Sequence, residues 1–461
     1  MNRKDRRAGK SKDSHHQNNI QILFEDALQH HNAGRLVEAE TLYKRILQLD
    51  LQHHPSLHQF GMIAYQAGRY DVAVQLISEA IKVRDDIPLY HFNLGKTFEA
   101  LKKNEEAKIC FKRALTLDAH DIKAANNLGM ILFSEGRYEE ARQLYDYALQ
   151  LNPLYPEALT NLGLYNLLHG NLKEGFRLHE SRTQIAAAPD YGFDKPPWDG
   201  HELKGKRILL HCEQGYGDNI QFIRYASAVK NKGGYVILPC FTPLVRLFET
   251  VEGIDEINQE GQDLPPYDYY ASLLSLPYLL GTDVTTIPAY IPYIHVNPNL
   301  KENWQARLKD CKGMKIGVAW RGNPKHVNDH KRSIDPALFA KAFAGIDATI
   351  VILQKDCMAD ELRLFGNENI MNAGATIEDF ADLAALMTNL DLVISVDTAI
   401  CHLAGALGLK VWTLLAYVPD WRWMLERDDS PWYPSMRLFR QRISGEWQEV
   451  LAEIRQSLAP G

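Results

Sequence analysis

The stretch EGRYEEARQLYDYALQLNP, residues 135–153, combines a glycine turn with an amphipathic helical pattern that stops at a proline. Its glycine, Gly136, recurs at a spacing of 34 residues, because 68 − 34 = 34, 136 − 68 = 2 × 34 and 170 − 136 = 34, with Lys102 in the missing step. Two further registers of small residues keep this period. They are Gly61, Gly95, Gly129 and Gly163, and Ala39, Ala73, Ala107 and Ala141. A fixed period of this length predicts a solenoid of stacked helix pairs.

The small residues allow helices to approach closely, and the turn glycines supply the left-handed backbone that ends a helix. Large apolar residues such as Phe111 and Tyr145 recur between them at helical spacing and would fill the seam. This pattern resembles tetratricopeptide repeats. We expect the array over residues 20–182, with four full repeats and a degraded fifth in which Gly175 replaces the usual alanine.

Asn93, Asn127 and Asn161 each precede a Leu-Gly pair and lie one repeat apart. Side-chain amides donate and accept hydrogen bonds, so a row of them can bind an extended peptide backbone with little regard to sequence. In this respect the array is similar to the asparagine ladder of O-GlcNAc transferases, which implies that it binds an acceptor peptide. The alternative is that asparagine is simply common at this repeat position.

The composition is that of a globular protein with two or three domains, since 461 residues exceed one ordinary core. With 51 basic and 58 acidic side chains, no general attraction to nucleic acid is expected. No apolar run approaches the roughly 18–20 residues of a membrane span, so membrane insertion is not expected. The six scattered cysteines favour reduced thiols and a cytoplasmic location. Residues 1–19, polar and basic, are expected to form a disordered arm without a secretory signal.

The second half differs in kind. All eight tryptophans lie between Trp198 and Trp447, after a linker predicted over residues 183–204. Six apolar runs alternate with helical patterns: RILLHC, YVILP, KIGVAW, TIVILQ, LDLVISV and KVWTLL. This alternation predicts parallel sheets with crossover helices. We expect two Rossmann-like halves facing a cleft, over residues 205–300 and 301–461.

The loop GYGD follows the first predicted strand, so Gly217 and Asp218 lie at the edge of the sheet where ligands bind. Ile220 stands where a dinucleotide fingerprint has its third glycine, and no Gly-Lys-Ser/Thr follows, which excludes a phosphate-binding P-loop. Asp218 is either a functional carboxylate or a helix cap.

A second loop, VDTAICH, ends another buried strand, and the first turn of its helix offers free N–H groups to a diphosphate. There Thr398 is a cap under the simpler interpretation and His402 a packed residue. The loop after KIGVAW supplies cations that suit an anionic leaving group or are merely solvated. They are Arg321, Lys325, Lys331 and Arg332. Gln354 ends the strand TIVILQ at the same kind of edge.

Together the segments GYGD, WRGNPKH with a later KRS, VDTAICHLAGALG and PDWRWMLERDDSPWYP resemble heptosyltransferase-like glycosyltransferases of the GT-B fold, over about residues 195–445. Such a domain behind a tetratricopeptide array is a known bacterial arrangement and is similar in layout to O-GlcNAc transferases. The resemblance implies Asp218 as general base and Asp397, Thr398 and Ala399 as the donor diphosphate site. A family lysine corresponds to either Lys325 or Lys331.

We therefore expect an inverting glycosyltransferase that moves a sugar from a nucleotide-sugar donor to a protein held by the repeats. We also assign donor binding to Gly217 and His402, in addition to the loop cations, Gln354 and the diphosphate-site residues named above. The chain has no Asp-x-Asp pair, so we expect no metal and no cofactor other than the nucleotide-sugar co-substrate. Two alternatives remain: a non-catalytic scaffold that binds a nucleotide or sugar, and a transferase acting on a polysaccharide or lipid-linked glycan.

Overall fold

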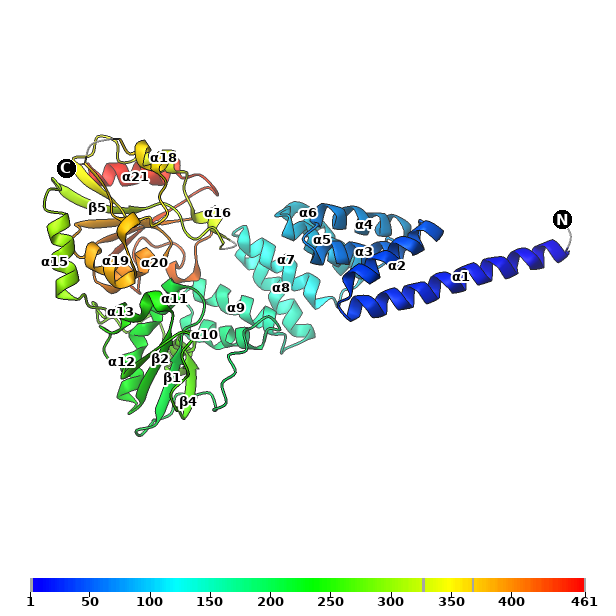
Figure 1. Ribbon diagram of the computed structural model, residues 1–461, viewed down its shortest axis with the longest axis horizontal. Coiled ribbons are helices and arrows are strands. Elements are labelled where there is room, and N and C mark those ends of the chain that lie inside the picture. The colour runs from blue at the N-terminus through cyan, green and yellow to red at the C-terminus, as the bar shows by residue number, and fades with distance from the viewer. Residues whose placement is uncertain (1–2, 326–327, 367–368, 460–461) are drawn as a thin grey trace. The chain divides into compact units, whose positions relative to one another are not determined.

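A computed structural model describes residues 3–325, 328–366 and 369–459 (Figure 1). The chain divides into two compact units between Asn161 and Leu162. Within the described residues no helix has both the length and the apolar character that a bilayer crossing requires.

The first unit is a series of antiparallel helix pairs, as the 34-residue period predicts. From α2 on, helices of 14 and 13 residues alternate. The helices are α1 Arg3–Asn32, α2 Leu36–Leu49, α3 His54–Gln66, α4 Tyr70–Val83, α5 Pro88–Ala100, α6 Asn104–Leu117, α7 Ile122–Ser134, α8 Tyr138–Leu151 and α9 Pro156–Leu168, the last of which crosses into the second unit.

The seam glycines are explained by close helix contacts. A Cβ atom on Gly95 would lie 2.8 Å from Phe111 Cε1, and one on Gly129 would lie 2.6 Å from Tyr145 Cε1. Both distances are too short for non-bonded carbon atoms, so each glycine makes room for a buried ring of the partner helix. In the fifth repeat Gly175 does the same for Leu167, whose Cγ would lie 2.6 Å away. The departure that made this repeat look degraded thus reflects a tighter helix pair.

The turn residues also behave as expected. Gly34, Gly68 and Gly136 have φ values of 73°, 70° and 81°, in the left-handed region that glycine adopts without strain. Lys102 occupies the equivalent turn with φ 59°. A lysine pays a steric cost there that glycine avoids.

Replacing Lys102 with glycine is expected to raise the free energy of unfolding by roughly 0.5–1 kcal/mol, the steric relief less the extra entropy of an unfolded glycine. Urea unfolding followed by far-UV circular dichroism measures the change. The matched control, Gly136→Lys, places lysine in an equivalent turn and should lower stability by a similar amount. A Lys102→Gly protein less stable than wild type would contradict the argument.

The first helix begins before the first repeat. Residues 3–19 form the start of α1, which continues to Asn32, and their role as a separate arm stays a prediction. No proline interrupts residues 3–32, and lysine, arginine and glutamine have good helix propensity, so the polar segment can extend the helix behind it.

The second unit is built on two all-parallel sheets with the orders β3-β2-β1-β4 and β10-β9-β8-β5-β6-β7. This confirms the α/β class with two Rossmann-like halves. The strands are β1 Arg207–His211, β2 Tyr235–Cys240, β3 Glu256–Gln259, β4 Tyr269–Ser272, β5 Met314–Ala319, β6 Ala348–Ile352, β7 Ile370–Asn372, β8 Leu392–Val396, β9 Val411–Leu415 and β10 Met436–Arg440.

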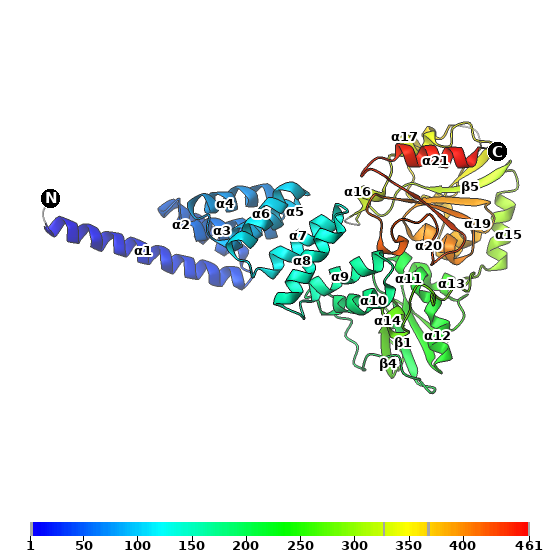
Figure 2. The same ribbon diagram turned by 180° about the vertical axis from the view of Figure 1, so that it is seen from behind.

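Helices of 4 to 11 residues precede, connect and follow these strands. They are α10 Leu172–His179, α11 Tyr216–Phe222, α12 Ala226–Asn231, α13 Val245–Phe248, α14 Leu276–Leu279, α15 Pro298–Arg307, α16 Asp329–Arg332, α17 Pro336–Lys341, α18 Ala359–Leu364, α19 Phe380–Met387, α20 Ala399–Ala406 and α21 Gln448–Leu458. In the opposite views of Figures 1 and 2, the second sheet lies between α21 on one face and α19 and α20 on the other.

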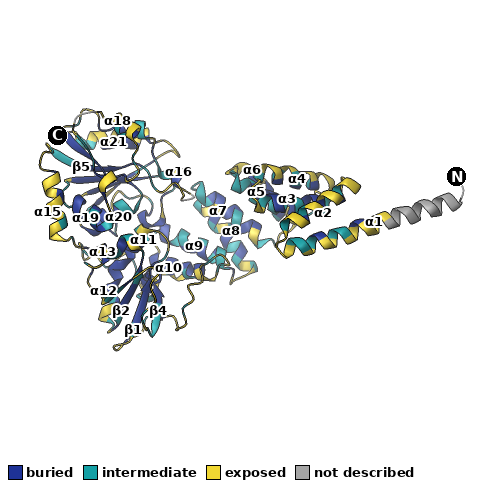
Figure 3. Ribbon diagram, viewed as in Figure 1, coloured by how far each residue is buried: buried dark blue, intermediate teal, exposed yellow. Residues whose placement is uncertain are grey.

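In the second half of this unit, a hydrophobic core joins the six-stranded sheet to α17 and α21. Ile316, Ile394 and Leu414 of the strands pack with Phe339 of α17 and Ile454 of α21, all buried. Figure 3 shows the central strands in dark blue, the colour of buried residues. Because both faces of this sheet are covered, its central strands are predominantly apolar.

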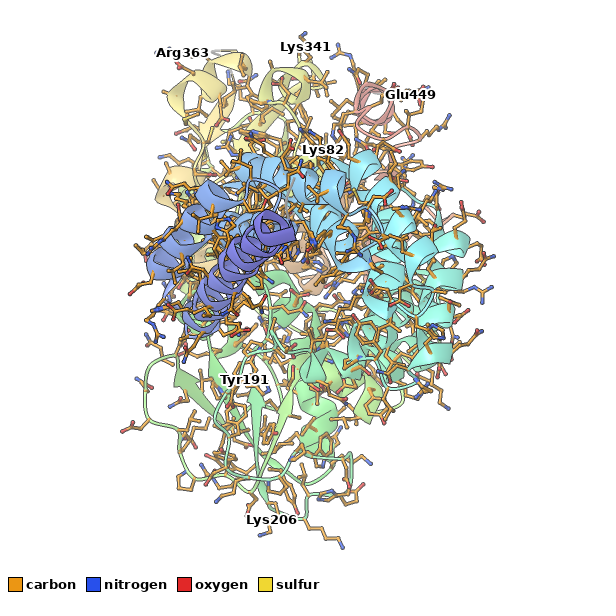
Figure 4. All side chains as sticks on the ribbon, turned by 90° about the vertical axis from the view of Figure 1, so that its right-hand side faces the viewer. Lys82, Tyr191, Lys206, Lys341, Arg363 and Glu449 are labelled. Atoms are coloured by element: carbon orange, nitrogen blue, oxygen red, sulfur yellow. The ribbon has the colours of Figure 1, made fainter. Side chains whose placement is uncertain are left out.

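The predicted linker packs on the first sheet. Tyr191, labelled in Figure 4, stacks on Phe193 with ring centroids 5.6 Å apart and contacts the His211 ring at 4.5 Å. Pro197 then pairs with Tyr270 of β4 as a parallel bridge. The linker is therefore an ordered extension of the second unit.

Candidate active site

The two predicted loops meet at the carboxyl ends of their sheets. α11 follows β1, α20 follows β8, and the two helices pack directly against each other. A Cβ atom on Gly217 would lie 2.8 Å from His402 Cδ2 and 3.5 Å from Ala399 Cα. Gly217 is therefore required for this close packing, which brings three predicted site residues together.

Asp218 lies in the first turn of α11. Its Oδ2 accepts a hydrogen bond from the Gly215 N–H at 2.9 Å, as a helix-capping carboxylate does. Its Oδ1 accepts from Nη2 of Arg422, in the second half of the unit. Burial raises the pKa of Asp218, while the Arg422 cation opposes that rise. The capping and functional interpretations of Asp218 are thus compatible.

Arg422 connects several groups around Asp218. Its Nε donates to Gln221 Oε1 at 2.5 Å and its Nη1 donates to Asp420 Oδ1 at 2.9 Å. Its guanidinium carbon lies 4.4 Å from the Trp421 ring centroid. The side chain is 7% exposed, so a buried cation organises the carboxylates of both halves.

A second arginine extends in the opposite direction, from the first half of the unit to the second. Arg224, just after α11, donates from Nη1 to the Trp432 carbonyl at 2.9 Å and from Nη2 to the Tyr293 hydroxyl at 3.0 Å. It is also buried, and it lies 4.8 Å from the Tyr433 ring centroid. Each half of the second unit therefore inserts one arginine into the other.

The segment predicted to bind a diphosphate begins α20, and its role stays a prediction. Thr398 caps α20, and its Oγ1 accepts from the Ile400 N–H at 3.3 Å. Burial and the nearby Asp420 charge raise the pKa of Asp397. Arg332 donates from Nη1 to the Asp397 carbonyl at 2.9 Å, so this cation reaches the start of the helix.

His402 is a packed residue on the same helix. Its Nδ1 lies 3.0 Å from the Tyr433 hydroxyl, and its ring stacks on Trp423 with centroids 5.2 Å apart. Burial lowers its pKa well below the ordinary value, which keeps the imidazole neutral. The aromatic residues of the PDWRW segment thus belong to the core beneath the site.

The other polar candidates point elsewhere. Arg321 donates to Glu361 and to the Asp356 carbonyl, and Gln354 donates to Asp356 Oδ1 at 2.8 Å. These contacts lie in the segment after β6. Lys325 and Lys331 occupy the loop and short helix before Arg332, and the choice between them stays open.

One group of described residues has metal-ligand chemistry. The potential ligand atoms of Asp397, Cys401 and His402 all lie within 4.8 Å of one another. Ligation would require the thiolate, but burial and the Asp397 carboxylate raise the pKa of Cys401, and its thiol donates to the Thr398 carbonyl at 2.9 Å. The residues fit a metal poorly, and metal independence stays a prediction.

In the first unit, the asparagine ladder is partly engaged within the array. Nδ2 of Asn93 lies 2.8 Å from His58 Nε2, and Nδ2 of Asn161 donates to Asn126 Oδ1 at 2.9 Å. Asn127 Oδ1 accepts from Asn126 at 3.4 Å. Bonds between repeats orient Asn93 and Asn161, whereas Asn127 bonds to its neighbour on the same helix. Binding of a peptide by these amides stays a prediction.

A further polar group lies behind the GYGD loop. Arg182, in the 3-10 helix Glu180–Gln184 that follows α10, forms two hydrogen bonds of 2.9 Å with Glu213 and one of 2.6 Å with Glu180. Ser272 Oγ donates to Glu213 at 2.5 Å. Since Glu213 lies two residues before Gly215, this buried ion pair connects the start of the GYGD segment to the 3-10 helix that follows α10.

Comparison with known proteins finds matches in both halves of the chain. Tetratricopeptide repeat models match residues 58–122 and 129–170, and the model of glycosyltransferase family 9 (heptosyltransferase) matches residues 372–448. The first half of the chain is thus similar to tetratricopeptide repeats, and residues 372–448 are similar to family 9 glycosyltransferases. The family 9 match includes Asp397–Ala399 and Arg422, whereas Asp218 lies before it.

Protein FlbA of Caulobacter vibrioides is 25% identical over 306 residues, which are 61% of this chain and 51% of FlbA. The chain therefore spans about half the length of that relative. Among solved structures, MamA is 19% identical with a TM-score of 0.32, covering 34% of this chain and 91% of MamA. YrrB, described as a TPR protein with an unusual peptide-binding site, is 20% identical with a TM-score of 0.32, covering 37% and 87%.

Sequence reasoning did not single out Arg422, Arg224 or the Arg182–Glu213 pair. Arg422 lies inside the PDWRW segment, which sequence reasoning interpreted through its aromatic residues. Its partner Asp218 is 204 positions away, and no periodicity connects residues so distant. A charged residue inside the aromatic segment of the family 9 region was the available signal, because such a residue becomes buried only with a partner.

Proposed function

We propose that this protein is a glycosyltransferase that uses a nucleotide sugar and transfers the sugar to a protein. The observation that carries the proposal is the meeting of Asp218, from the first half, with the start of α20, from the family 9 region, around Arg422. A base and an anion site on facing sheets are what sugar transfer from a diphosphate requires.

In this mechanism Asp218 removes the proton of the acceptor hydroxyl, while the oxygen of that hydroxyl attacks the anomeric carbon of the donor sugar. Attack occurs from the face opposite the nucleotide, which inverts the anomeric centre. The N–H groups at the start of α20 and the Arg332 cation stabilise the charge that develops on the diphosphate. Cationic and backbone groups replace a metal ion in this scheme.

The repeats support a protein acceptor, because a solenoid presents an extended binding surface. All six cysteines are free thiols, which supports a reducing compartment such as the cytoplasm. The acceptor and the location are part of the proposal, as is the inverting, metal-independent chemistry.

Thermal unfolding with UDP, GDP, ADP, TDP or CMP, without added metal, tests the donor site. A nucleotide at roughly one hundred times its Kd stabilises the native state by about 2.7 kcal/mol, so one of the five should raise the melting temperature clearly. Asp397→Ala should lose this shift, while Asp310→Ala, at an exposed position, should retain it. If no nucleotide raises the wild-type melting temperature, the proposal fails.

A further inference from the structure

The second unit contains a cavity of about 230 Å³ between its last repeat helices and the candidate active site. Because one water needs about 10–15 Å³, the cavity has room for an organic group of several heavy atoms. Leu164, Phe176 and His179 of α9 and α10 line it. Gln214, Asp420 and Arg422 also contribute to the lining.

This cavity adjoins the proposed base. Arg422 connects the two, because it lines the cavity and donates to Asp218. Gln214 lies just before α11, the helix that carries Asp218, and holds φ 61°, a left-handed conformation that a non-glycine residue adopts at some cost. A group bound here would lie beside Arg422, which contacts the carboxylate of Asp218.

The lining residues of the cavity differ in their exposure to solvent. Gln214 and Asp420 are exposed and lie at the rim, whereas Phe176 and His179 are buried. Burial lowers the pKa of His179 to about 3, so its imidazole is neutral and offers one donor and one acceptor. Arg422 is the buried cation of the lining, and its charge is already paired with Asp218 and Asp420, so the interior suits an uncharged group with few polar atoms.

The number of unpaired hydrogen-bonding groups in the cavity discriminates between acceptors. The Arg422 side chain already donates to Asp218, Asp420 and Gln221. The Asp420 carboxylate accepts a further bond from the backbone N–H of Arg422. A sugar brings several hydroxyls, each of which must find a partner when buried. A serine or threonine residue brings one hydroxyl and its two backbone groups, which His179 and Gln214 can satisfy.

We propose that this cavity receives the hydroxyl-bearing residue of a protein acceptor, a serine or threonine, next to Asp218. The inference rests on the proposed transferase function and narrows its acceptor class. Three of the nine lining residues come from α9 and α10, so these two helices help to form the site that selects the acceptor residue.

Binding of the dipeptide acetyl-Ser-Thr-amide, measured by saturation-transfer NMR on the full chain, tests the proposal, with methyl glucoside as the comparison probe. Leu164 is half-buried in the cavity wall, so Leu164→Trp should fill the space and weaken dipeptide binding at least tenfold. The matched control, Leu264→Trp, makes the same change at an exposed position and should bind as wild type does.

Leu164→Phe serves as a milder second variant, and an unchanged melting temperature shows that either variant is folded. Equal dipeptide binding by wild type and both Leu164 variants would overturn the proposal, as would binding of the glucoside in place of the dipeptide or binding of neither. If the dipeptide binds in a Leu164-dependent way while all five nucleotides fail to bind, the transferase function fails and the peptide pocket stands.

Discussion

Asp218→Asn is expected to lower the rate of sugar transfer by about 10²–10⁴-fold, the contribution typical of a general base. Asparagine has the same shape and can still accept the hydrogen bond of the Gly215 N–H, so the helix start is preserved. It cannot accept a proton from the acceptor. Transfer is measured with the sugar derivative of the nucleotide that raises the melting temperature, and nucleotide binding should be unchanged.

The pH dependence provides a second readout for this variant. The base acts when ionised, and burial raises the pKa of Asp218 above its ordinary value. The wild-type rate should therefore rise as pH increases through that raised pKa, and the rise should vanish in the variant. Asp310→Asn, at an exposed position, is the matched control. A loss below tenfold in Asp218→Asn would remove this residue as the base.

Arg182→Met is expected to cost about 3–5 kcal/mol of stability, because it leaves the Glu213 carboxylate buried without its cation. Arg182 and Glu213 have side chains only 7% and 14% exposed, so water cannot replace the lost partner. Urea unfolding followed by tryptophan fluorescence is well suited to this measurement, since all eight tryptophans lie in the second unit.

The chain supplies a control for this prediction in the preceding helix. Arg177 and Glu174 form a comparable ion pair at 2.6 Å, with side chains 54% and 41% exposed. Arg177→Met should cost no more than about 1 kcal/mol, as exposed pairs do. The double variant Arg182→Met, Glu213→Gln should recover part of the loss. Equal effects of Arg182→Met and Arg177→Met would refute the role of burial.

The strands that sequence reasoning found and those that it missed differ in their place in the sheet. The six apolar runs became β1, β2, β5, β6, β8 and β9, which are the inner strands of the two sheets. The four missed strands, β3, β4, β7 and β10, are the four sheet edges. Inner strands of a parallel sheet are apolar because both faces are covered, whereas edge strands such as IMN, residues 370–372, carry no such signal.

A similar limit applies to the site. Sequence reasoning selected residues that follow strands, and the structure brings Gly217, Asp218 and the start of α20 together, while their roles stay predictions. Arg321 and Gln354 also follow strands, but nearby acidic partners hold them after β6. Which of several cations reaches an anion site depends on such partners, and loop spacing does not encode them.

The reciprocal arginines have a consequence for motion. If the two halves of the second unit swung apart as rigid bodies, Arg224 would leave the Trp432 carbonyl and Arg422 would leave Asp218 in the same movement. Separating the buried Arg422–Asp218 ion pair costs about 3–5 kcal/mol, and such a hinge would also have to break the buried hydrogen bond of Arg224 to the Trp432 carbonyl. We therefore expect substrates to enter through rearrangement of surface loops, with the paired halves acting as one stiff frame.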